Sequence, residues 1–397
     1  MVVYRLCLPK SQGHGPNTIN LVSLGPVLFS LAKSYATIII CGRAERHKKK
    51  PEADLPSMIH RPLQQLVVAK DAAIGLLLAY IGGWLPEMVP DRKLLNDKTA
   101  IVTGANAGIG YAIALRIADM GATVYLACRN EEKARTARES ILKTYSNAKV
   151  HVLVLDNASL ASVKAFAKDW NYGPIDLFFH NAGIGQTAEG QDFTQDAFEY
   201  VYQCNFLASF LLTHLLESQL SPDARVVFTS SAASYPGVIR DTFALSKTQN
   251  VIETYFHARD ESHNGAAKYS NSKLMQAAFA RALQEHLDLD PENKRLAFSF
   301  EPGLVKSNIA NGFSKTFLQD PYSWIIAKTI PYFGLDISQG AVTGVHLATS
   351  SRDEVVHNKG RYFDRMKVRM HYVDLYSKEK LDKLWTRWSA DAEISWT

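Results

Sequence analysis

The sequence is poor in cysteine and nearly balanced in charge. Its four cysteines are scattered with no Cys-x-x-Cys pair, so we expect neither a disulfide framework nor a zinc site, and a reducing compartment is the default. The net charge is only +5 at pH 7 over 397 residues, and no basic-aromatic stripe is present. We therefore expect no nucleic-acid partner and no bound metal. The hydrophobic fraction of 47% is enough for one large domain plus an extension.

Long uninterrupted apolar segments are also scarce, and both candidates lie before residue 96. Residues 19–41 are apolar but contain Pro26 and Lys33. Residues 72–85 are apolar but shorter than the roughly 20 residues that cross a bilayer as a helix. This second segment can lie in the membrane interface or dip in and return, with Tyr80 and Trp84 at headgroup depth. A cleavable signal peptide is not expected, because no compact apolar core with a small-residue cleavage site lies near the N-terminus.

We interpret residues 1–96 as an extension with two candidate membrane-anchoring segments, 19–41 and 72–85. Basic residues at 43, 46 and 48–50 follow the first segment, which favours a cytosolic location for everything after them. The alternative is an apolar helix docked on the main domain, next to a disordered basic linker. Pro86 and Pro90 mark the linker into the main domain, which we place at residues 97–397.

From Lys98 onward, apolar runs alternate with amphipathic stretches. The expected strands are residues 99–103, 123–127, 150–155, 175–179, 225–229 and 296–300. Helical patterns lie between them, for example at 131–144 and 159–170, and a further pattern at 378–388 predicts a helix docked on the domain. Nearly all-apolar strands separated by helices indicate a parallel sheet covered on both faces. We predict an α/β fold of the Rossmann type, a doubly wound parallel sheet of about seven strands.

A glycine-rich stretch follows the first strand and reads TGANAGIG from Thr103 to Gly110. In our interpretation Gly104 allows a tight turn, Gly108 lets a pyrophosphate approach the backbone, and Gly110 lets the next helix pack closely on the strand. The positive end of that helix would then face the phosphates. The spacing G-x-x-x-G-x-G differs from the standard dinucleotide fingerprint, and a simple tight turn is the alternative.

The second and third strands end in residues that suit a nucleotide. Arg129 follows the second strand, where an NAD-preferring site would carry Asp or Glu. This arginine would attract a 2′-phosphate, so NADP(H) is favoured over NAD(H), although a plain surface arginine is the alternative. Asp156 and Asn157 end the third strand and can hydrogen-bond an adenine edge. A helix cap would look similar.

The fourth strand ends in His180-Asn181-Ala182-Gly183. The small residues let the backbone pass close to a ribose, and Asn181 can brace neighbouring loops. We expect His180 to be a hydrogen-bonded histidine at the strand end, without a chemical role.

A serine pair and a Tyr-x-x-x-Lys pattern carry the chemistry. Ser230-Ser231 follows the fifth strand, and Tyr269 and Lys273 stand four residues apart, on one helix face. A tyrosine is a useful acid–base group near neutral pH only if its pKa falls from about 10. A neighbouring ammonium and an oxidised nicotinamide both favour the phenolate. A serine hydroxyl can hold the substrate oxygen beside that phenol.

Together these motifs resemble the short-chain dehydrogenase/reductase family over about residues 98–363. The resemblance rests on TGANAGIG (103–110), HNAG (180–183), SS (230–231), YSNSK (269–273) and PGLVKSN (302–308), all in the family's order. Within the family the chain is most similar to retinol-dehydrogenase-like members, through VYLACRN (124–130), GAVTGVHLATS (340–350) and GRYF (360–363).

The resemblance implies roles for four catalytic residues. Tyr269 is expected to be the general acid/base, and Lys273 to lower its pKa and hold the nicotinamide ribose. Ser231 is expected to orient the carbonyl, and Asn205 to support a water relay to Lys273. Ser307 falls where the family usually has the threonine that contacts the nicotinamide carboxamide. The implied cofactor contacts are Gly104, Asn106, Gly108, Ile109, Gly110, Arg129, Asp156, Asn157, Asn181, Ala182, Gly183, Tyr269, Lys273, Pro302, Gly303, Val305 and Ser307.

Two departures from the family pattern stand out. His180 replaces an asparagine, which we expect to be tolerated because that position has a structural role. Ser231 and Tyr269 are separated by an unusually long segment, although retinol-dehydrogenase-like members already lengthen it. We interpret residues 235–268 as a substrate-pocket insertion, since so long a loop in a compact domain is usually functional or disordered. His257 and His263 within it are expected to be exposed loop histidines.

We therefore expect an NADP(H)-dependent oxidoreductase that interconverts a lipophilic alcohol and its aldehyde or ketone, of retinoid, sterol or fatty-chain type. One alternative is a soluble reductase of small aldehydes or quinones. Another is a dinucleotide-binding redox sensor without turnover, against which the four intact catalytic residues argue. The expected location is the membrane of the endoplasmic reticulum or a lipid droplet, with the main domain in the cytosol; the alternative is cytoplasmic. A homodimer is implied by the resemblance alone.

Overall fold

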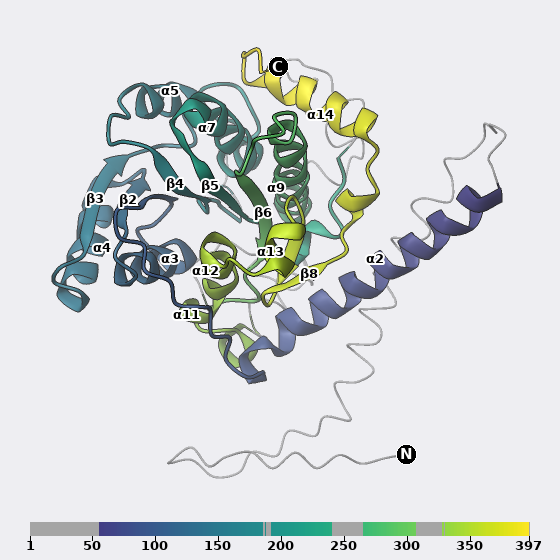
Figure 1. The fold of residues 1–397 in the computed structure, drawn as a ribbon, viewed down its shortest axis with the longest axis horizontal. Helices are drawn as coiled ribbons and strands as arrows, with labels where there is room; N and C mark the ends of the chain where they lie inside the picture. Colours follow the sequence, from purple (N-terminus) through teal and green to yellow (C-terminus); the bar gives the residue numbers. More distant parts are fainter. Residues whose placement is uncertain are drawn as a thin grey trace, which may run out of the picture. The chain divides into compact units, whose positions relative to one another are not determined.

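The computed structural model describes residues 55–185, 187, 192–239, 265–306, 328 and 330–396. The chain divides into two units, residues 1–52 and 53–397. In the second unit the described residues form an eight-stranded sheet of order β3-β2-β1-β4-β5-β6-β7-β8 (Figure 1). The strands are β1 (Thr99–Thr103), β2 (Thr123–Cys128), β3 (Lys149–Val154), β4 (Ile175–His180), β5 (Leu220–Thr229), β6 (Leu296–Glu301), β7 (Tyr362–Asp364) and β8 (Lys367–Arg369).

The doubly wound parallel sheet is confirmed. Strands β1 to β7 pair in parallel, and β8 pairs with β7 in the antiparallel direction. All six expected strands are present, with β5 beginning at Leu220 rather than at residue 225. The sheet has one strand more than the seven or so expected. Strands β7 and β8 have three residues each, too short to produce a periodic pattern in the sequence.

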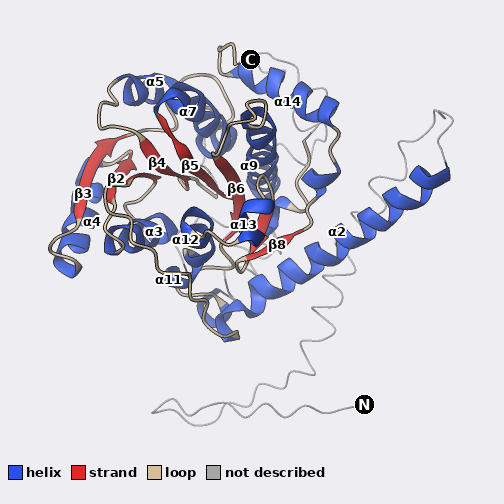
Figure 2. Cartoon of the chain, viewed as in Figure 1, coloured by secondary structure: helices blue, strands red, loops and turns tan. Residues whose placement is uncertain are grey.

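Helices cover both faces of the sheet (Figures 1 and 2). One face carries α3 (Gly108–Asp119), α4 (Glu131–Thr144) and α12 (Val342–Thr349), and the other carries α5 (Leu160–Lys168), α7 (Ala208–Leu216) and α9 (Gly265–Leu287). The remaining elements are α2 (Leu55–Ile81), η2 (Gly82–Trp84), α6 (Tyr200–Tyr202), η3 (Gln203–Leu207), η4 (Glu217–Gln219), η5 (Ala232–Ser234), α11 (Ile337–Gly340), α13 (Asp353–His357), η7 (Tyr372–Leu375) and α14 (Lys378–Asp391).

Burial along the strands follows from this double cover. Every residue of β4 and of β6 is buried, because a central parallel strand has helices on both sides. Strand β3 lies at the edge and is exposed at three of its six positions. The apolar strands therefore form the core of the domain.

The C-terminal helix α14 docks on the domain, as its apolar spacing predicts. Trp388 is 2% exposed. Its ring centroid lies 4.7 Å from that of Phe206 and 5.9 Å from that of Phe210, both near the start of α7. It also contacts Phe279 of α9, at 6.1 Å. This aromatic cluster joins α14 to α7 and α9.

The apolar segment 72–85 forms the second half of α2 and the turn η2. One face of α2 packs on the domain through buried Val68 and Ala72, and the Asp71 carboxylate accepts a 2.9 Å hydrogen bond from the Met370 backbone N–H. At Gly83 a Cβ would lie only 2.7 Å from the Phe333 carbonyl oxygen, so this close approach requires glycine. No helix of the described residues is long and apolar enough to span a bilayer, and segment 19–41 falls outside the residues described.

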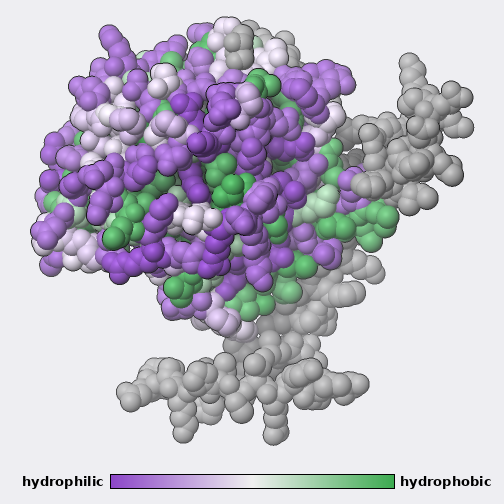
Figure 3. Space-filling view, in the orientation of Figure 1, coloured by the Kyte–Doolittle hydropathy of each residue, from purple (hydrophilic) through white to green (hydrophobic). Residues whose placement is uncertain are grey.

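The opposite face of α2 is also mostly apolar, with exposed Lys70 as the exception. Leu63, Leu66, Val67 and Leu77 recur there at helical spacing and are all exposed, with Leu66 at 71%. Figure 3 shows hydrophobic residues along this helix, beside a mainly hydrophilic surface of the domain. An apolar periodicity that covers both faces is unusual for a helix on a protein surface.

Replacing Trp388 with alanine should lower the free energy of unfolding by about 3–5 kcal/mol, because it empties the centre of the aromatic cluster. Trp84→Ala is the matched control, since Trp84 is 54% exposed and its loss should cost about 1 kcal/mol or less. Urea unfolding followed by circular dichroism measures both. If Trp388→Ala lost no more than the 1 kcal/mol or so expected of the control, α14 would contribute little to the stability of the domain.

Candidate active site

A cavity of about 570 Å³ opens at the carboxyl ends of the central strands. It lies where the strand order reverses, between β1 and β4, which is the usual ligand position in a doubly wound sheet. Residues from the ends of β1, β2, β3, β4, β5 and β6 line it, together with α9. Leu76 and Ala79 of α2 also line it, so the N-terminal helix supplies part of its wall.

The glycine-rich turn borders this cavity. Gly104 and Gly108 adopt left-handed backbone angles, φ +67° and +60°, which favour glycine. A Cβ on Gly110 would lie 2.6 Å from the Gly104 carbonyl oxygen, so Gly110 packs beneath the turn rather than lining the cavity. Asn106 and Ile109 line it. The turn thus brings the start of α3 to the cavity without bulk between them.

Thr103 and Asn181 connect the ends of β1 and β4. The Thr103 hydroxyl accepts hydrogen bonds from the backbone N–H groups of Asn181 (2.9 Å) and Ala182 (3.0 Å). The Asn181 side-chain amide donates to the Thr103 carbonyl at 3.1 Å. Ala182 and Gly183 continue along the cavity wall. Asn181 therefore braces the two loops, as its sequence position suggests.

Polar residues line the end of the cavity beside β2 and β3. Arg129 is exposed, and its guanidinium donates to the Tyr200 hydroxyl at 3.4 Å. Lys133, in the first turn of α4, lines the same region. Asp156 and Asn157 also line it, but the Asp156 carboxylate accepts from the Ala158 N–H (2.9 Å) and the Asn157 amide donates to the Cys204 carbonyl (3.0 Å).

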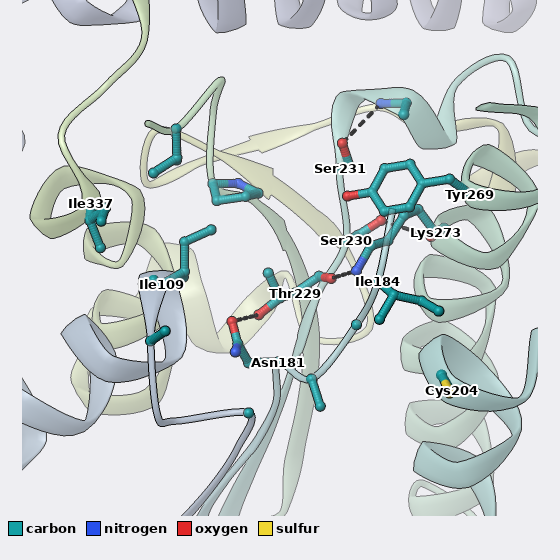
Figure 4. A pocket seen from close by; sticks show the side chains of 18 of the residues that line it. Ile109, Asn181, Ile184, Cys204, Thr229, Ser230, Ser231, Tyr269, Lys273 and Ile337 are labelled. Atoms are coloured by element: carbon teal, nitrogen blue, oxygen red, sulfur yellow. Dashed lines mark hydrogen bonds between the residues drawn. The ribbon is translucent and has the colours of Figure 1, made fainter. Parts of the chain in front are cut away.

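Ser231, Tyr269 and Lys273 meet on the other side of the cavity (Figure 4). The Tyr269 phenol and the Ser231 hydroxyl point into the same space. The Lys273 Nζ lies 5.5 Å from the Tyr269 ring centroid and donates to the Thr229 carbonyl at 2.7 Å. The sequence pattern therefore identifies three side chains that converge in space from two elements 38 positions apart in the chain.

Burial controls the charge states of this cluster. Burial lowers the pKa of Lys273 to about 7, against an opposing effect of the Glu301 carboxylate. Burial raises the pKa of Tyr269, Glu301 raises it further, and a hydrogen bond with Ser231 lowers it. The sequence led us to expect a lowered pKa for Tyr269, but within the protein alone desolvation outweighs the favourable contacts. Ionisation of the phenol near neutral pH requires a positive charge beside it.

Asn205 is fully buried behind the cluster rather than lining the cavity. It belongs to the π-turn η3, in which the Ala208 N–H donates to the Gln203 carbonyl five residues earlier. Its side-chain oxygen accepts from the Ile184 N–H at 2.8 Å, and its amide donates to the Ser272 hydroxyl at 3.0 Å. Such single π-turns in helices are frequent at functional sites.

Glu301 is a pocket residue that sequence reasoning missed. This carboxyl group, at the end of β6, is buried and lines the cavity. It accepts hydrogen bonds from the Gly303 N–H (2.8 Å) and the Tyr362 hydroxyl (3.3 Å). Burial raises its pKa to about 8, and the neighbouring Asp364 adds to this effect. A charged residue ending a mostly apolar strand, directly before Pro-Gly, was the signal that could have revealed it.

The other expected residues fall into three groups. Pro302, Gly303 and Val305 line the cavity. His180 is buried, shares a 2.9 Å hydrogen bond with the Thr213 hydroxyl, and is held neutral because burial lowers its pKa to about 3. Ser307, His257 and His263 are not among the described residues, and neither are residues 240–264 of the insertion.

Known proteins share this chain's sequence pattern. The family model for short chain dehydrogenase matches residues 98–248. The chain is 34% identical over 303 residues to the bovine (Bos taurus) dehydrogenase/reductase SDR family member 13, covering 73% of both. It is 32% identical to the polyprenol dehydrogenase of Mus musculus, covering 76% of this chain and 86% of that one. It is 29% identical to retinol dehydrogenase 13 of Homo sapiens, covering 82% and 92%.

Solved structures agree on the fold. An uncharacterized protein from Mycobacterium paratuberculosis superposes with a TM-score of 0.57 at 24% identity, over 77% of this chain and 97% of that one. A short chain dehydrogenase from Pseudomonas syringae gives a TM-score of 0.50 at 20% identity, over 71% and 99%.

Proposed function

Because this chain belongs to the short-chain dehydrogenase/reductase family, we propose that it is an NADP(H)-dependent oxidoreductase that interconverts a lipophilic alcohol and its aldehyde or ketone. The observation that carries the proposal is the meeting of Ser231, Tyr269 and Lys273 in a cavity that also has the glycine-rich turn and the apolar helix α2 in its wall. These parts provide an acid–base group, a dinucleotide cradle and an apolar surface in one place.

The residues present fit a nicotinamide dinucleotide. Helix α3 begins at Gly108, and Ala107 before it supplies no side-chain hydrogen bond to cap the first N–H groups. Uncapped N–H groups at a helix start suit a pyrophosphate. Opposite the turn, a Cβ on Gly104 would lie 2.9 Å from the Ala182 Cα, so the wall is built from minimal side chains. Lys273 would hold the nicotinamide ribose.

The chemistry divides between cofactor and protein. When bound, the nicotinamide supplies or accepts the hydride. In the reduction, the Tyr269 phenol donates a proton to the substrate oxygen, and in the oxidation its phenolate accepts the proton of the alcohol. The Ser231 hydroxyl holds that oxygen beside the phenol. The Lys273 ammonium stabilises the phenolate, which counteracts the desolvation that raises the pKa of Tyr269.

Two cations support the preference for NADP(H). Arg129 and Lys133 both line the cavity beyond the end of β2, where the adenosine ribose of the cofactor would lie. A 2′-phosphate carries negative charge that a guanidinium can bind with two parallel hydrogen bonds.

The wall contributed by α2 supports a lipophilic substrate. Leu76 and Ala79 place apolar surface in the same cavity as the acid–base group. Two relatives are named as dehydrogenases of retinol and of polyprenol, both long apolar alcohols. We extend that substrate class to this chain and assign the insertion at 235–268 to the same pocket.

NADPH consumption over a panel from short aldehydes to retinal and sterol ketones tests this function. We expect turnover with the long apolar carbonyls, and none in Tyr269→Phe, because the variant lacks the hydroxyl that donates the proton. Cofactor binding, measured by protein fluorescence, should persist in the variant. Turnover confined to small carbonyls would favour the soluble reductase. Activity surviving in Tyr269→Phe would refute the assigned proton donor, and NADPH binding without any turnover would favour the redox sensor.

The cofactor preference is tested by Arg129→Asp. The carboxylate repels a 2′-phosphate and can accept a hydrogen bond from a free ribose 2′-hydroxyl. The ratio of kcat/KM for NADPH to that for NADH should therefore fall by at least about tenfold, equivalent to about 1.4 kcal/mol. Lys143→Asp, in the last turn of the helix α4 that follows Arg129 and away from the cavity, is the charge-matched control. An unchanged ratio in Arg129→Asp would exclude a role in 2′-phosphate binding.

We further propose that the outward face of α2 rests on a lipid surface, of the endoplasmic reticulum or of a lipid droplet. The basic residues at 43, 46 and 48–50 precede α2 in the sequence and suit anionic headgroups. The outward face is apolar, while the opposite face borders the cavity. A substrate dissolved in lipid would then enter beside α2.

Replacing Leu66 by glutamate should weaken this attachment, because it places a charge on the lipid-facing side of α2. Co-flotation of the full chain with liposomes of zwitterionic and anionic lipid measures the bound fraction, which should fall several-fold. Leu289→Glu is the control, since Leu289 is equally exposed at 71% but lies outside α2, just after the end of α9. Equal binding by both variants would remove α2 from the lipid contact.

A further inference from the structure

Gln276 lies one turn after Lys273 on α9 and is completely buried. Its side-chain oxygen accepts a hydrogen bond from the Lys273 Nζ at 3.1 Å. Its side-chain nitrogen donates to the backbone carbonyl of Asn205 at 2.6 Å. One amide therefore connects the lysine of the cluster to the π-turn η3.

The two partners fix the orientation of this amide. An ammonium can only donate hydrogen bonds, and a carbonyl can only accept them. The oxygen of Gln276 must then face Lys273, and the nitrogen must face Asn205. Flipping the amide would leave two buried polar contacts repulsive, which costs more than losing a hydrogen bond at the surface.

The Gln276 side chain takes up a hydrogen-bonding position on the carbonyl of Asn205. The resemblance to the family led us to expect a water relay between Asn205 and Lys273. In this chain a side chain already donates to the Asn205 carbonyl, and it also accepts from the lysine. The link between these two residues is therefore made by protein atoms.

We propose that Gln276 is a positioning residue, which ties the Lys273 ammonium to the Asn205 carbonyl and so holds it beside the Tyr269 phenol. The proposal rests on the proposed function, in which Tyr269 exchanges the proton. The carbonyl of Thr229 at the end of β5 holds the same ammonium at 2.7 Å. Strand β5, helix α9 and turn η3 thus meet at one charged group, and an ammonium has a third donor to offer a ligand.

A neutral amide suits this position better than a carboxylate. The charged or titratable groups that act on Lys273 and Tyr269 include Glu301 on β6, which already raises the pKa of both. A second carboxylate would stabilise the ammonium but disfavour the phenolate. The amide of Gln276 accepts from Lys273 without adding a negative charge near Tyr269.

The test compares Gln276→Met, of similar length but without the amide, with the wild type. Loss of an acceptor disfavours the buried ammonium, so the phenolate of Tyr269 is also less favoured. The pH profile of kcat for alcohol oxidation should shift upward by about one unit, with about tenfold less activity at pH 7 and recovery at higher pH. Gln276→Asn, which keeps an amide on a shorter side chain, should shift the pH profile less than Gln276→Met does.

Gln284→Met is the matched control. Gln284 lies two turns further along α9, is 3% exposed, and accepts from the Ala297 N–H at 2.7 Å, away from the cavity. Its loss should lower stability without moving the pH profile. If both variants lower activity alike and neither shifts the profile, Gln276 is a structural residue and the proposal is wrong.

A readout independent of turnover separates this inference from the proposed function. Labelling the lysine Cε with ¹³C, with the Lys273 signal identified by its loss in Lys273→Arg, reports the pKa of Lys273 directly. That pKa should fall in Gln276→Met and rise in Gln276→Glu, which keeps the size of the side chain and serves if the methionine variant does not fold. An unchanged pKa in the variants that fold overturns the proposal. Absent turnover in the wild type would refute the proposed function alone.

Discussion

The hydrogen bonds between Thr103 and Asn181 hold the ends of β1 and β4 together. After these two strands the chain turns to opposite faces of the sheet. Strand β1 continues into the glycine-rich turn and α3 on one face of the sheet, and β4 continues toward the opposite face. Without this brace the two loops could close over the gap between them. With it, the gap stays open as a cavity, and the close approach of Gly104 to Ala182 leaves no room for a side chain at position 104. The nucleotide side and the acid–base side of the site both depend on this junction.

On the acid–base side of the site, burial disfavours the charged form of each titratable group. Lys273, Tyr269 and Glu301 are all desolvated, and in each case burial is the largest cause that moves the pKa toward the neutral form. In so apolar a setting, a single added charge changes the protonation of every neighbour. The nicotinamide of a bound cofactor is positively charged only in its oxidised form. We therefore expect its oxidation state to determine whether the phenol of Tyr269 ionises.

The sequence predicted what depends on local order. Apolar strands such as 175–179 are visible because they are short runs of mostly apolar residues, and Tyr269 and Lys273 are visible because they stand only four residues apart. Glu301 and Gln276 were missed because their importance lies in partners that are distant in the chain, Tyr362 for one and Asn205 for the other. Strands β7 and β8 were missed because three residues show no period. Segment 72–85 was ambiguous because α2 is apolar on both faces, which periodicity cannot distinguish from a membrane segment.

The two faces of α2 also bear on how such an enzyme can diverge. Successive residues of an α-helix are rotated by about 100°, so inserting or deleting one residue before Leu76 would rotate a different set of side chains of α2 into the cavity wall. Because both sets are apolar, the helix could still dock after such a change. A change in the length of this helix could thus alter the shape of the pocket while leaving the catalytic residues and the core untouched.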